Sequence, residues 1–262
     1  MSNIKNLINS ILGKFNYRVI NTAASENDKY FELDATIKIK IKPYTMLNDI
    51  RLKNIIDTMN CISQNKIDGD IVECGVWKGG SVALMAHTML KNNDLRNLHL
   101  FDAFDEICQP DAAVDGTRAI REVGGLDNAK GKLEPVKGIY NNDTIGGAGN
   151  EEQVLHLLTE DIGFPSEKIH LHKGWFQDVL PTTKHEIKKI ALLRLDGDWY
   201  ASTKVCLDHL FEKLIIGGIL IVDDYGAYEG CKKAVDEYCQ NNNIYPIINN
   251  VDSECIYWIK QA

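Results

Sequence analysis

The sequence lacks an apolar run long enough to cross a membrane, because its longest apolar stretches have only the length of strands. Its first twenty residues also lack the ordered basic, apolar and small-residue regions of a signal peptide. We therefore expect a cytoplasmic protein with no stable membrane insertion. The amphipathic stretch NLINSILGKF (6–15) is expected to dock on its own domain; contact with a membrane, or with another subunit of a homo-oligomer, stays open.

The chain has no C-x-x-C pair, and its seven cysteines are odd in number, which is typical of free thiols in a reducing compartment. Basic residues are also in short supply: 29 Lys and Arg stand against 37 Asp and Glu, so the formal net charge is −8. This charge argues against a nucleic-acid partner, because phosphate binding needs a basic field.

What the sequence does contain is an alternation of short apolar segments with amphipathic ones. The apolar segments predict strands at 70–75, 97–103, 168–174, 190–196 and 218–224. Helical spacing follows at 81–90, 202–214 and 228–240, and the alternating tail 253–260 predicts an antiparallel edge strand. The expected fold class is α/β, a doubly wound and mostly parallel sheet with an antiparallel edge hairpin.

The expected organisation is one core with two additions. An N-terminal helical segment, 1–65, contains the helix-like stretch 48–63, and the main domain spans 66–262. The glycine-rich stretch 104–163 is too long for a simple connection, which predicts a functional insertion.

Acidic residues stand where the predicted strands end. Ligands of open α/β sheets bind at this edge, and it collects six carboxylates: Glu73, Asp102, Asp196, Asp198, Asp223 and Asp224. Taken singly, each has an ordinary explanation; Asp198 could cap the next helix and Asp224 could stabilise a turn. Taken together, they repel one another, and their convergence predicts a bound cation.

The turn ECGVWKGGS (73–81) follows the first strand. Its glycines let the backbone approach a ligand at a helix N-terminus. It departs from G-x-G-x-x-G, and its acid precedes the glycine, which favours a ligand with positive charge over a pyrophosphate. The second strand ends in Asp102, which can accept hydrogen bonds from a ribose. S-adenosylmethionine fits both features.

The chain resembles the macrocin O-methyltransferase family in several motifs, spread from about residue 44 to 238: YTML…RL, GDIVECGVWKGGS, FDAFDE, KGWFQDVLP, LRLDGDWYAST and IVDDYG. The resemblance implies a Rossmann-like class I methyltransferase that uses S-adenosylmethionine and Mg²⁺ to methylate a hydroxyl of a sugar or glycan-type acceptor. It implies metal ligation by Asp196, Asp223 and Asp224, with Asp196 also the general base. Around the cofactor it implies Glu73, Gly75, Ser81, Asp102, Gly174, Trp175, Tyr44, Thr45 and Met46.

The chemistry of such a site can be argued from the residue types alone. A set of carboxylates favours Mg²⁺, Ca²⁺ or Mn²⁺ over Zn²⁺. The metal would lower the pKa of a sugar hydroxyl and fix its direction, and a neighbouring carboxylate would take the proton. Asp196 is the candidate base because its strand adjoins the cofactor strand. Asp198 would orient the site or ligate the metal through water.

Other residue types have weaker patterns. His170 and His172 alternate on one predicted strand and are expected to be strand residues rather than a metal pair, and His209 is expected to be structural. Cys74 is expected to be a small packing residue. Among the tryptophans, Trp175 is the strongest candidate for stacking on adenine.

Other functions stay open at this stage. A catechol-type O-methyltransferase uses similar metal-binding acids for aromatic diols. A nicotinamide-dependent oxidoreductase is a further alternative, although the missing second glycine and the absence of a Tyr-x-x-x-Lys pair argue against it.

Overall fold

A seven-stranded sheet forms the centre of the protein, in the order β3-β2-β1-β4-β5-β7-β6. The computed structural model describes residues 34–140 and 146–261. The strands are β1 (Asp70–Cys74), β2 (Leu98–Asp102), β3 (Ile169–Lys173), β4 (Ile190–Leu195), β5 (Leu214–Val222), β6 (Asn249–Asn250) and β7 (Ile256–Ile259). Neighbours among β1 to β5 pair in parallel, while β7 pairs antiparallel with both β5 and β6. The predicted mostly parallel sheet with an antiparallel edge hairpin is therefore confirmed.

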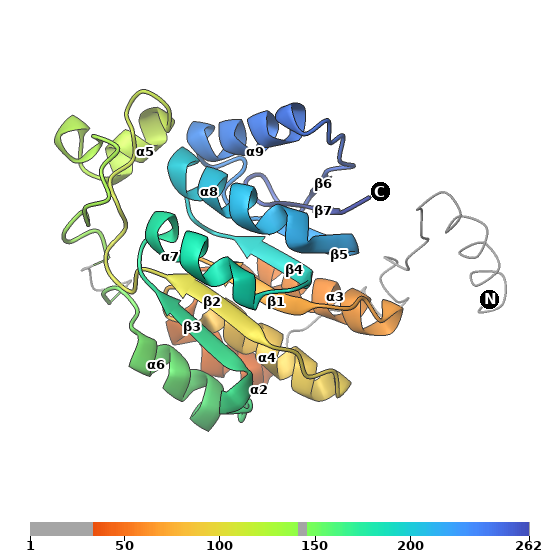
Figure 1. Ribbon diagram of the computed structural model, residues 1–262. Helices are drawn as coiled ribbons and strands as arrows, with labels where there is room; N and C mark the ends of the chain where they lie inside the picture. The colour runs from red at the N-terminus through yellow and green to blue at the C-terminus, as the bar shows by residue number, and fades with distance from the viewer. Residues whose placement is uncertain (1–33, 141–145, 262) are drawn as a thin grey trace.

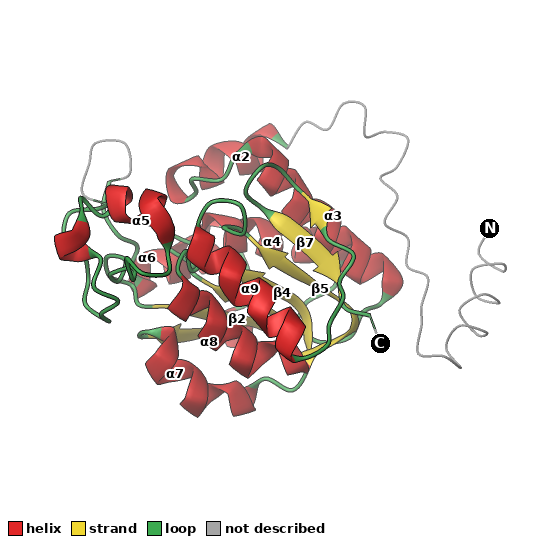
Figure 2. Cartoon of the chain, turned by 90° about the horizontal axis from the view of Figure 1, so that it is seen from above, coloured by secondary structure: helices red, strands yellow, loops and turns green. Residues whose placement is uncertain are grey.

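The helices cover both faces of this sheet (Figures 1 and 2). One layer contains α2 (Ala35–Ile41), α3 (Asp49–Asn65), α4 (Gly80–Asn92) and α6 (Glu151–His156), which a π-helical turn continues over Leu157–Asp161. The other contains α7 (Phe176–Thr183), α8 (Tyr200–Leu210) and α9 (Glu229–Asn241). Short 3-10 turns lie at Lys42–Tyr44, Leu126–Asn128, Ser166–Lys168, Lys184–Glu186 and Phe211–Lys213.

Two apolar cores hold these layers to the sheet. Residues of α3 and α4 pack against one face, as Ile55 and Leu84 do, and residues of α8 and α9 pack against the other, as Leu207 and Val235 do. Because both faces are covered, every residue of β4 is buried. This double burial explains why the central strands have near-continuous apolar sequences.

The chain between β2 and β3 contains the stretch 104–163, whose role as a functional insertion stays a prediction, and its helix α5 (Gly116–Glu122) lies on the side of the sheet where the parallel strands end (Figure 1). Its two ends lie beside Asp102, the last residue of β2, and Trp77, in the turn after β1, which are themselves joined by a hydrogen bond from the Trp77 amide to Asp102 Oδ2 at 2.8 Å. At the first end, the Phe104 amide donates to Asp102 Oδ1 at 2.7 Å. At the second, Trp77 Nε1 donates to the Gly147 carbonyl at 3.3 Å, and a Cβ on Gly149 would lie 1.9 Å from the Trp77 carbonyl oxygen. Residues 151–161 are helical and pack on α4, so the irregular part is shorter than 104–163.

Two further predictions concern the chain as a whole. All seven cysteines are free thiols, as their odd number and spacing predicted. No helix within 34–140 or 146–261 is long and apolar enough to cross a membrane. The amphipathic stretch 6–15 lies outside the described residues.

Candidate active site

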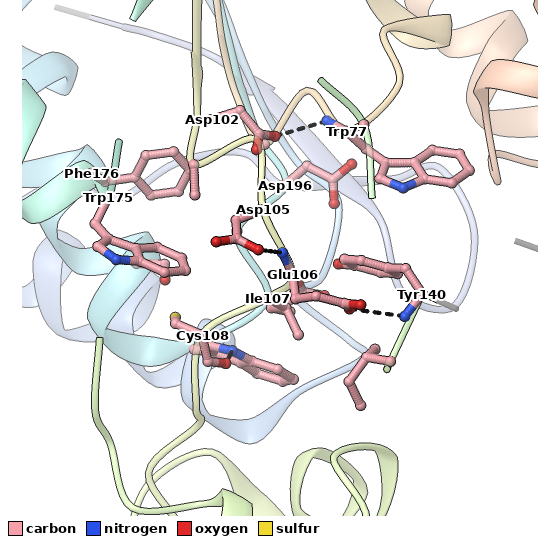
Figure 3. Close-up of a pocket in the computed structure, with 18 of the residues that line it drawn as sticks. Trp77, Asp102, Asp105, Glu106, Ile107, Cys108, Tyr140, Trp175, Phe176 and Asp196 are labelled. Carbon is pink, nitrogen blue, oxygen red and sulfur yellow. Dashed lines mark hydrogen bonds between the residues drawn. The ribbon is translucent and has the colours of Figure 1, made fainter. Parts of the chain in front are cut away.

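A cavity of about 390 Å³ opens where β1, β2 and β4 end (Figure 3). Gly75, Asp102 and Asp196 lie in its wall, one from each strand end, and Gly174 joins them from the turn after β3. The position agrees with the general rule for open α/β sheets. The sequence therefore located the right edge of the sheet.

Gly75 is required by a contact inside the protein. Its φ is +89°, and a Cβ there would lie 1.7 Å from the carbonyl oxygen of Asp196. The turn after β1 is thus pressed against the end of β4, which brings the predicted cofactor turn and the predicted base together. A second close approach occurs at Gly80, where a Cβ would lie 2.5 Å from the Tyr44 carbonyl oxygen. That contact seats the segment before α3 on the first turn of α4.

Asp102 already accepts three backbone hydrogen bonds. Oδ2 accepts from the amide of Trp77 at 2.8 Å (Figure 3) and from that of Val76 at 2.6 Å, and Oδ1 accepts from Phe104. Burial raises the pKa of this carboxyl, and the three amides oppose that rise. Since an oxygen can accept two hydrogen bonds, Oδ1 retains capacity for a ligand hydroxyl.

The other predicted cofactor residues divide into two groups. Met46, Gly174 and Trp175 border the cavity, and Trp175 lies beside Phe176 on its wall (Figure 3). Four others do not contribute to the described wall: Glu73, Ser81, Tyr44 and Thr45. Their contact with a cofactor stays a prediction.

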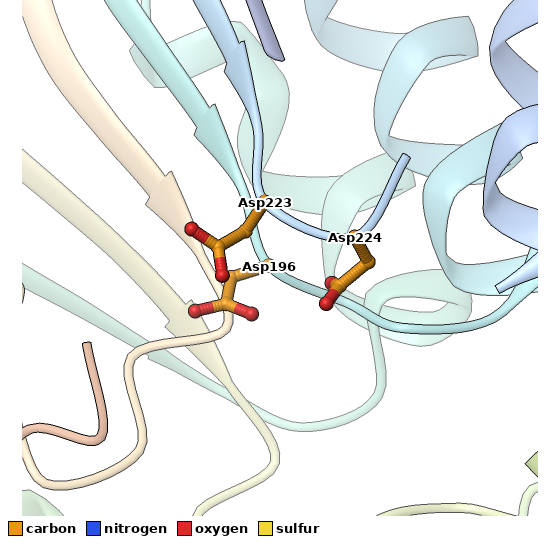
Figure 4. Close-up of side chains that lie close together, drawn as sticks. All are labelled: Asp196, Asp223 and Asp224. Atoms are coloured by element: carbon orange, nitrogen blue, oxygen red, sulfur yellow. The ribbon is translucent and has the colours of Figure 1, made fainter. Parts of the chain in front are cut away.

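Asp196, Asp223 and Asp224 converge at the ends of β4 and β5 (Figure 4). One carboxylate oxygen of each lies within 4.8 Å of the others, and no other such His, Cys, Asp or Glu group of three or more occurs in the part of the chain that the structure describes. Burial raises the pKa of Asp196 to about 6, and burial with the neighbouring acids raises the pKa of Asp224 well above its usual value. Three hard, negatively charged oxygen donors that repel one another fit Mg²⁺, Ca²⁺ or Mn²⁺.

Two arginines form ion pairs with this cluster, and neither was predicted from the sequence. Arg194, only 1% exposed, donates from Nη1 to Glu73 Oε1 at 2.7 Å and to Asp196 Oδ2 at 2.8 Å, and from Nη2 to Asp223 Oδ1 at 2.6 Å. Arg51 of α3 donates from Nη1 to Asp223 Oδ2 at 2.6 Å. The signal for Arg194 was present in the sequence, because a charged residue inside a buried strand must find partners.

Glu73 is fully buried, and its second oxygen, Oε2, has no hydrogen-bond partner among the described residues. Burial raises the pKa of Glu73 to about 7, against the opposing charge of Arg194. Glu73 is the first residue of the predicted cofactor turn, and Arg194 connects it to Asp196 and Asp223 of the acid cluster.

Asp198 borders the cavity in a strained backbone conformation. Its φ is +58°, which is uncommon for a residue with a side chain. Its amide donates to Asp224 Oδ2 at 3.1 Å, whereas the N-cap position of α8 is Trp199 and the first amide of the helix, that of Tyr200, donates to Asp115 Oδ1 at 2.7 Å. The capping explanation for Asp198 is therefore wrong. Burial, together with Asp196 and Asp223, raises its pKa well above the usual value.

The histidines predicted to be structural lie apart from this cavity. His172 Nε2 and His99 Nδ1 are 3.2 Å apart, and His99 Nε2 is 3.5 Å from Asp70 Oδ2. His170 stacks on His99, with ring centroids 4.6 Å apart. His170 and His172 are strand residues of β3, as predicted.

The macrocin-O-methyltransferase (TylF) family profile matches residues 6–126 and 150–260. The chain belongs to this family. It is therefore an S-adenosylmethionine-dependent O-methyltransferase, and the oxidoreductase alternative is excluded.

Several characterised proteins are similar to this O-methyltransferase. Demethyldecarbamoylnovobiocin O-methyltransferase of Streptomyces niveus is 33% identical over 217 residues, which cover 82% of this chain and 75% of that protein. The 8-demethyl-8-(2,3-dimethoxy-alpha-L-rhamnosyl)-tetracenomycin-C 4'-O-methyltransferase of Streptomyces olivaceus is 30% identical over 216 residues, covering 82% and 75%. The solved structure of the O-methyltransferase NovP superposes with a TM-score of 0.66 at 29% identity, covering 100% of this chain and 99% of that one.

Proposed function

We propose that this enzyme transfers the methyl group of S-adenosylmethionine to a sugar hydroxyl of a small-molecule glycoside, with Mg²⁺ as the metal and Asp196 as the general base. The observation that carries the proposal is the position of Asp196. It belongs to the triple acid cluster and also borders the cavity, directly beside the turn that contains Gly75. The relative of Streptomyces olivaceus, whose name specifies a dimethoxy-rhamnosyl acceptor, supports a sugar as acceptor.

The proposed reaction is an in-line displacement. The hydroxyl oxygen forms a bond to the methyl carbon, the bond from that carbon to sulfur breaks, and the hydroxyl proton passes to a base. Asp196 Oδ2 is engaged by Arg194, which leaves Oδ1 to accept this proton. Mg²⁺ bound by the three aspartates would supply Lewis-acid activation of the hydroxyl.

The cavity wall also favours one form of acceptor. Its described residues combine aromatic rings, such as Trp175 and Tyr228, with carboxylates, such as Glu106 and Glu122, and include no Lys, Arg or His. A phosphate group would meet like charges there. We therefore propose a sugar attached to an uncharged carrier rather than to a nucleoside diphosphate.

The test is methyl transfer to matched acceptors, in which one sugar is offered as an aryl glycoside or as its nucleoside diphosphate, alongside a catechol. We expect turnover of the aryl glycoside, loss of activity with EDTA and recovery with Mg²⁺. Activity unaffected by EDTA would remove the metal from the proposal. Preference for the nucleotide sugar would overturn the choice of carrier, and preference for the catechol would favour the aromatic alternative.

Asp102 gives a separate test of cofactor binding. Asp102→Ala should weaken S-adenosylmethionine by about 1–3 kcal/mol, because three backbone amides and a ribose hydroxyl lose their acceptor. Asp105→Ala removes a carboxylate from the same wall but leaves those amides paired, so it is the matched control. Calorimetry that showed equal affinity for both variants would contradict the assignment.

A further inference from the structure

Arg51 is the residue through which α3 reaches the acid cluster. Its guanidinium contacts three acids: Asp223 at 2.6 Å, Asp252 at 2.7 Å and Glu254 at 2.9 Å. Its side chain is 13% exposed, so these ion pairs are largely shielded from water. Asp252 and Glu254 belong to the loop before β7, and Arg51 thereby joins the N-terminal helix, the C-terminal hairpin and the cluster at one point.

Asp223 and Asp224 differ in how they are held. Both oxygens of Asp223 accept from guanidinium groups, Oδ1 from Arg194 and Oδ2 from Arg51, each at 2.6 Å. Asp224 Oδ2 accepts from the neutral backbone amide of Asp198 at 3.1 Å. Of these two candidate metal ligands, Asp223 is therefore held by two positively charged guanidinium groups, and Asp224 by the dipole of one backbone amide.

We propose that Arg51 is a positioning residue that fixes the Asp223 carboxylate and, as a permanent cation beside it, keeps the affinity of the acid cluster for a divalent metal low. The inference rests on the metal site of the proposed function. A cation bound to Asp223 would lie close to the Arg51 guanidinium, and the two positive charges would repel each other. At such short range this repulsion is appreciable even at a high effective dielectric constant. The fork shape of the guanidinium is needed for the three contacts, but its charge alone accounts for the repulsion.

Removing Arg51 should strengthen metal binding but slow methyl transfer, so the two measurements can be told apart. Removing its charge should tighten metal binding, because Asp223, Asp252 and Glu254 then present more negative charge to the ion. Removing its hydrogen bonds should lower the rate constant of methyl transfer, because Asp223 is no longer fixed on its Oδ2 side. A residue with a structural role alone would weaken metal binding and rate together.

The variants are chosen to separate the effect of the Arg51 charge from the effect of its forked shape. Arg51→Gln removes the charge and keeps a polar side chain, Arg51→Met removes it and keeps the apolar stem, and Arg51→Lys keeps the charge without the fork. Lys53→Gln is the matched control: it removes the same charge from the same helix, where Lys53 pairs with Asp57 at 2.6 Å instead of with the cluster. The fold should survive in the Arg51 variants, since Glu254 keeps Arg118 and Asp252 keeps Asn48 as partners.

The measurement is Mn²⁺ binding to EDTA-treated protein by electron paramagnetic resonance, with circular dichroism to verify folding. We expect Arg51→Gln and Arg51→Met to bind Mn²⁺ at least about 10-fold more tightly than the unaltered protein, by the Coulomb energy of a single charge at this range. Arg51→Lys should stay within about 3-fold, and Lys53→Gln should not change. In turnover assays, Arg51→Gln should need less Mg²⁺ for half-activation while its kcat falls.

Equal or weaker Mn²⁺ binding in both neutral variants would overturn the inference while leaving the metal site intact. Equal tightening in Lys53→Gln would also overturn it, since the effect would then belong to net charge rather than to Arg51. If the unaltered protein and all variants bound no Mn²⁺, the proposed metal site would fail and the inference would fail with it. Methyl transfer measured on the same samples distinguishes that outcome from failure of the enzymatic function.

Discussion

Two buried polar clusters lie on the same sheet, and they differ in how they are satisfied. The cluster at the ends of β1, β4 and β5 consists of full charges, with Arg194 among three carboxylates. The cluster on β2 and β3 consists of stacked imidazoles, in which the His172 ring lies 4.2 Å from that of Phe101 and pairs with His99. The first borders a cavity, whereas no histidine of the second lines that cavity, and His99 stacks with both His170 and His172.

The difference shows what distinguishes a ligand site from a polar core. Burying a charge is costly unless partners offset it, and buried ion pairs seldom repay their desolvation. In the acid cluster, Asp224 and Asp198 add further carboxylates beyond those that Arg194 holds, which leaves an excess of negative charge beside the cavity. In the imidazole stack, each ring finds a partner within the protein. Excess charge next to a cavity, not polarity alone, therefore marks the functional cluster.

The largest expected effect comes from removing the reactive charge of the acid cluster. Asp196→Asn keeps a side-chain oxygen for Arg194 but loses the proton acceptor and one metal ligand. Loss of a general base costs about 10²–10⁴-fold in rate, so we expect the upper end of this range or beyond in single-turnover methyl transfer at saturating cofactor and Mg²⁺.

Asp198→Asn is the comparison variant for Asp196, two residues away on the same loop. As an orienting residue it should cost about 10–100-fold. A severe defect in Asp198→Asn beside a mild one in Asp196→Asn would reverse the two roles. Mild defects in both would show that neither residue is the base.

A smaller effect, on stability rather than rate, should follow from removing the central cation. Arg194→Leu leaves Glu73, Asp196 and Asp223 without their shared partner, and breaking a buried pair in this way typically costs about 3–5 kcal/mol. Urea unfolding at neutral pH measures the loss, and Mg²⁺ should recover part of it by replacing the lost charge. Unchanged stability would mean that water, not Arg194, satisfies these acids.

The smallest expected effect concerns the imidazole stack and its pH dependence. Burial and the neighbouring His99 lower the pKa of His172 from 6.5 to about 4, while Glu186 opposes and His170 adds to the shift. The folded state thus binds a proton less readily than the unfolded chain, so stability should fall as the pH decreases from about 6.5 to 4. In His172→Phe this part of the pH dependence should disappear.

The control for His172 is His185→Phe, which alters an exposed histidine outside the stack. Free energies of unfolding at pH 7.5, 6 and 5 should run parallel to those of the unaltered protein in this variant. A pH dependence in His172→Phe that matched the unaltered protein would assign the acid sensitivity to other groups.

The fold was largely predictable because it follows from local periodicity. Near-continuous apolar segments such as 190–195 indicated parallel strands, and strand ends then located Asp196, Asp223 and Asp224 at one edge. Those three residues are near in sequence to the elements that position them. The antiparallel strand β7 could be predicted for the same reason, because its side chains alternate between the two faces of the strand.

The partners of those acids were harder to predict because they depend on tertiary contacts. Arg51 is 172 residues from Asp223, and its helical position gave no reason to prefer one charged residue of α3 over another. The pairing of His99 with His172 requires the register of β2 against β3, which no local pattern specifies. Asp198 was misread as a possible cap because aspartate before a helix is common, whereas its left-handed backbone depends on the loop around it.

The two ends of the chain between β2 and β3 are held at neighbouring points, the end of β2 and the turn after β1, and this has a consequence for how the enzyme can diversify. Phe104 and Gly149 are held beside Asp102 and Trp77, so the intervening chain is a closed loop on a fixed base. In polymer terms, the entropy of closing a flexible loop changes only with the logarithm of its length, and doubling the length costs about 0.6 kcal/mol. Insertions into the exposed stretch 130–134 should therefore cost the fold little, whereas the contacts of this loop with the core, such as the Arg118–Glu254 ion pair and the buried Val123, must be kept when a new acceptor preference is grafted there.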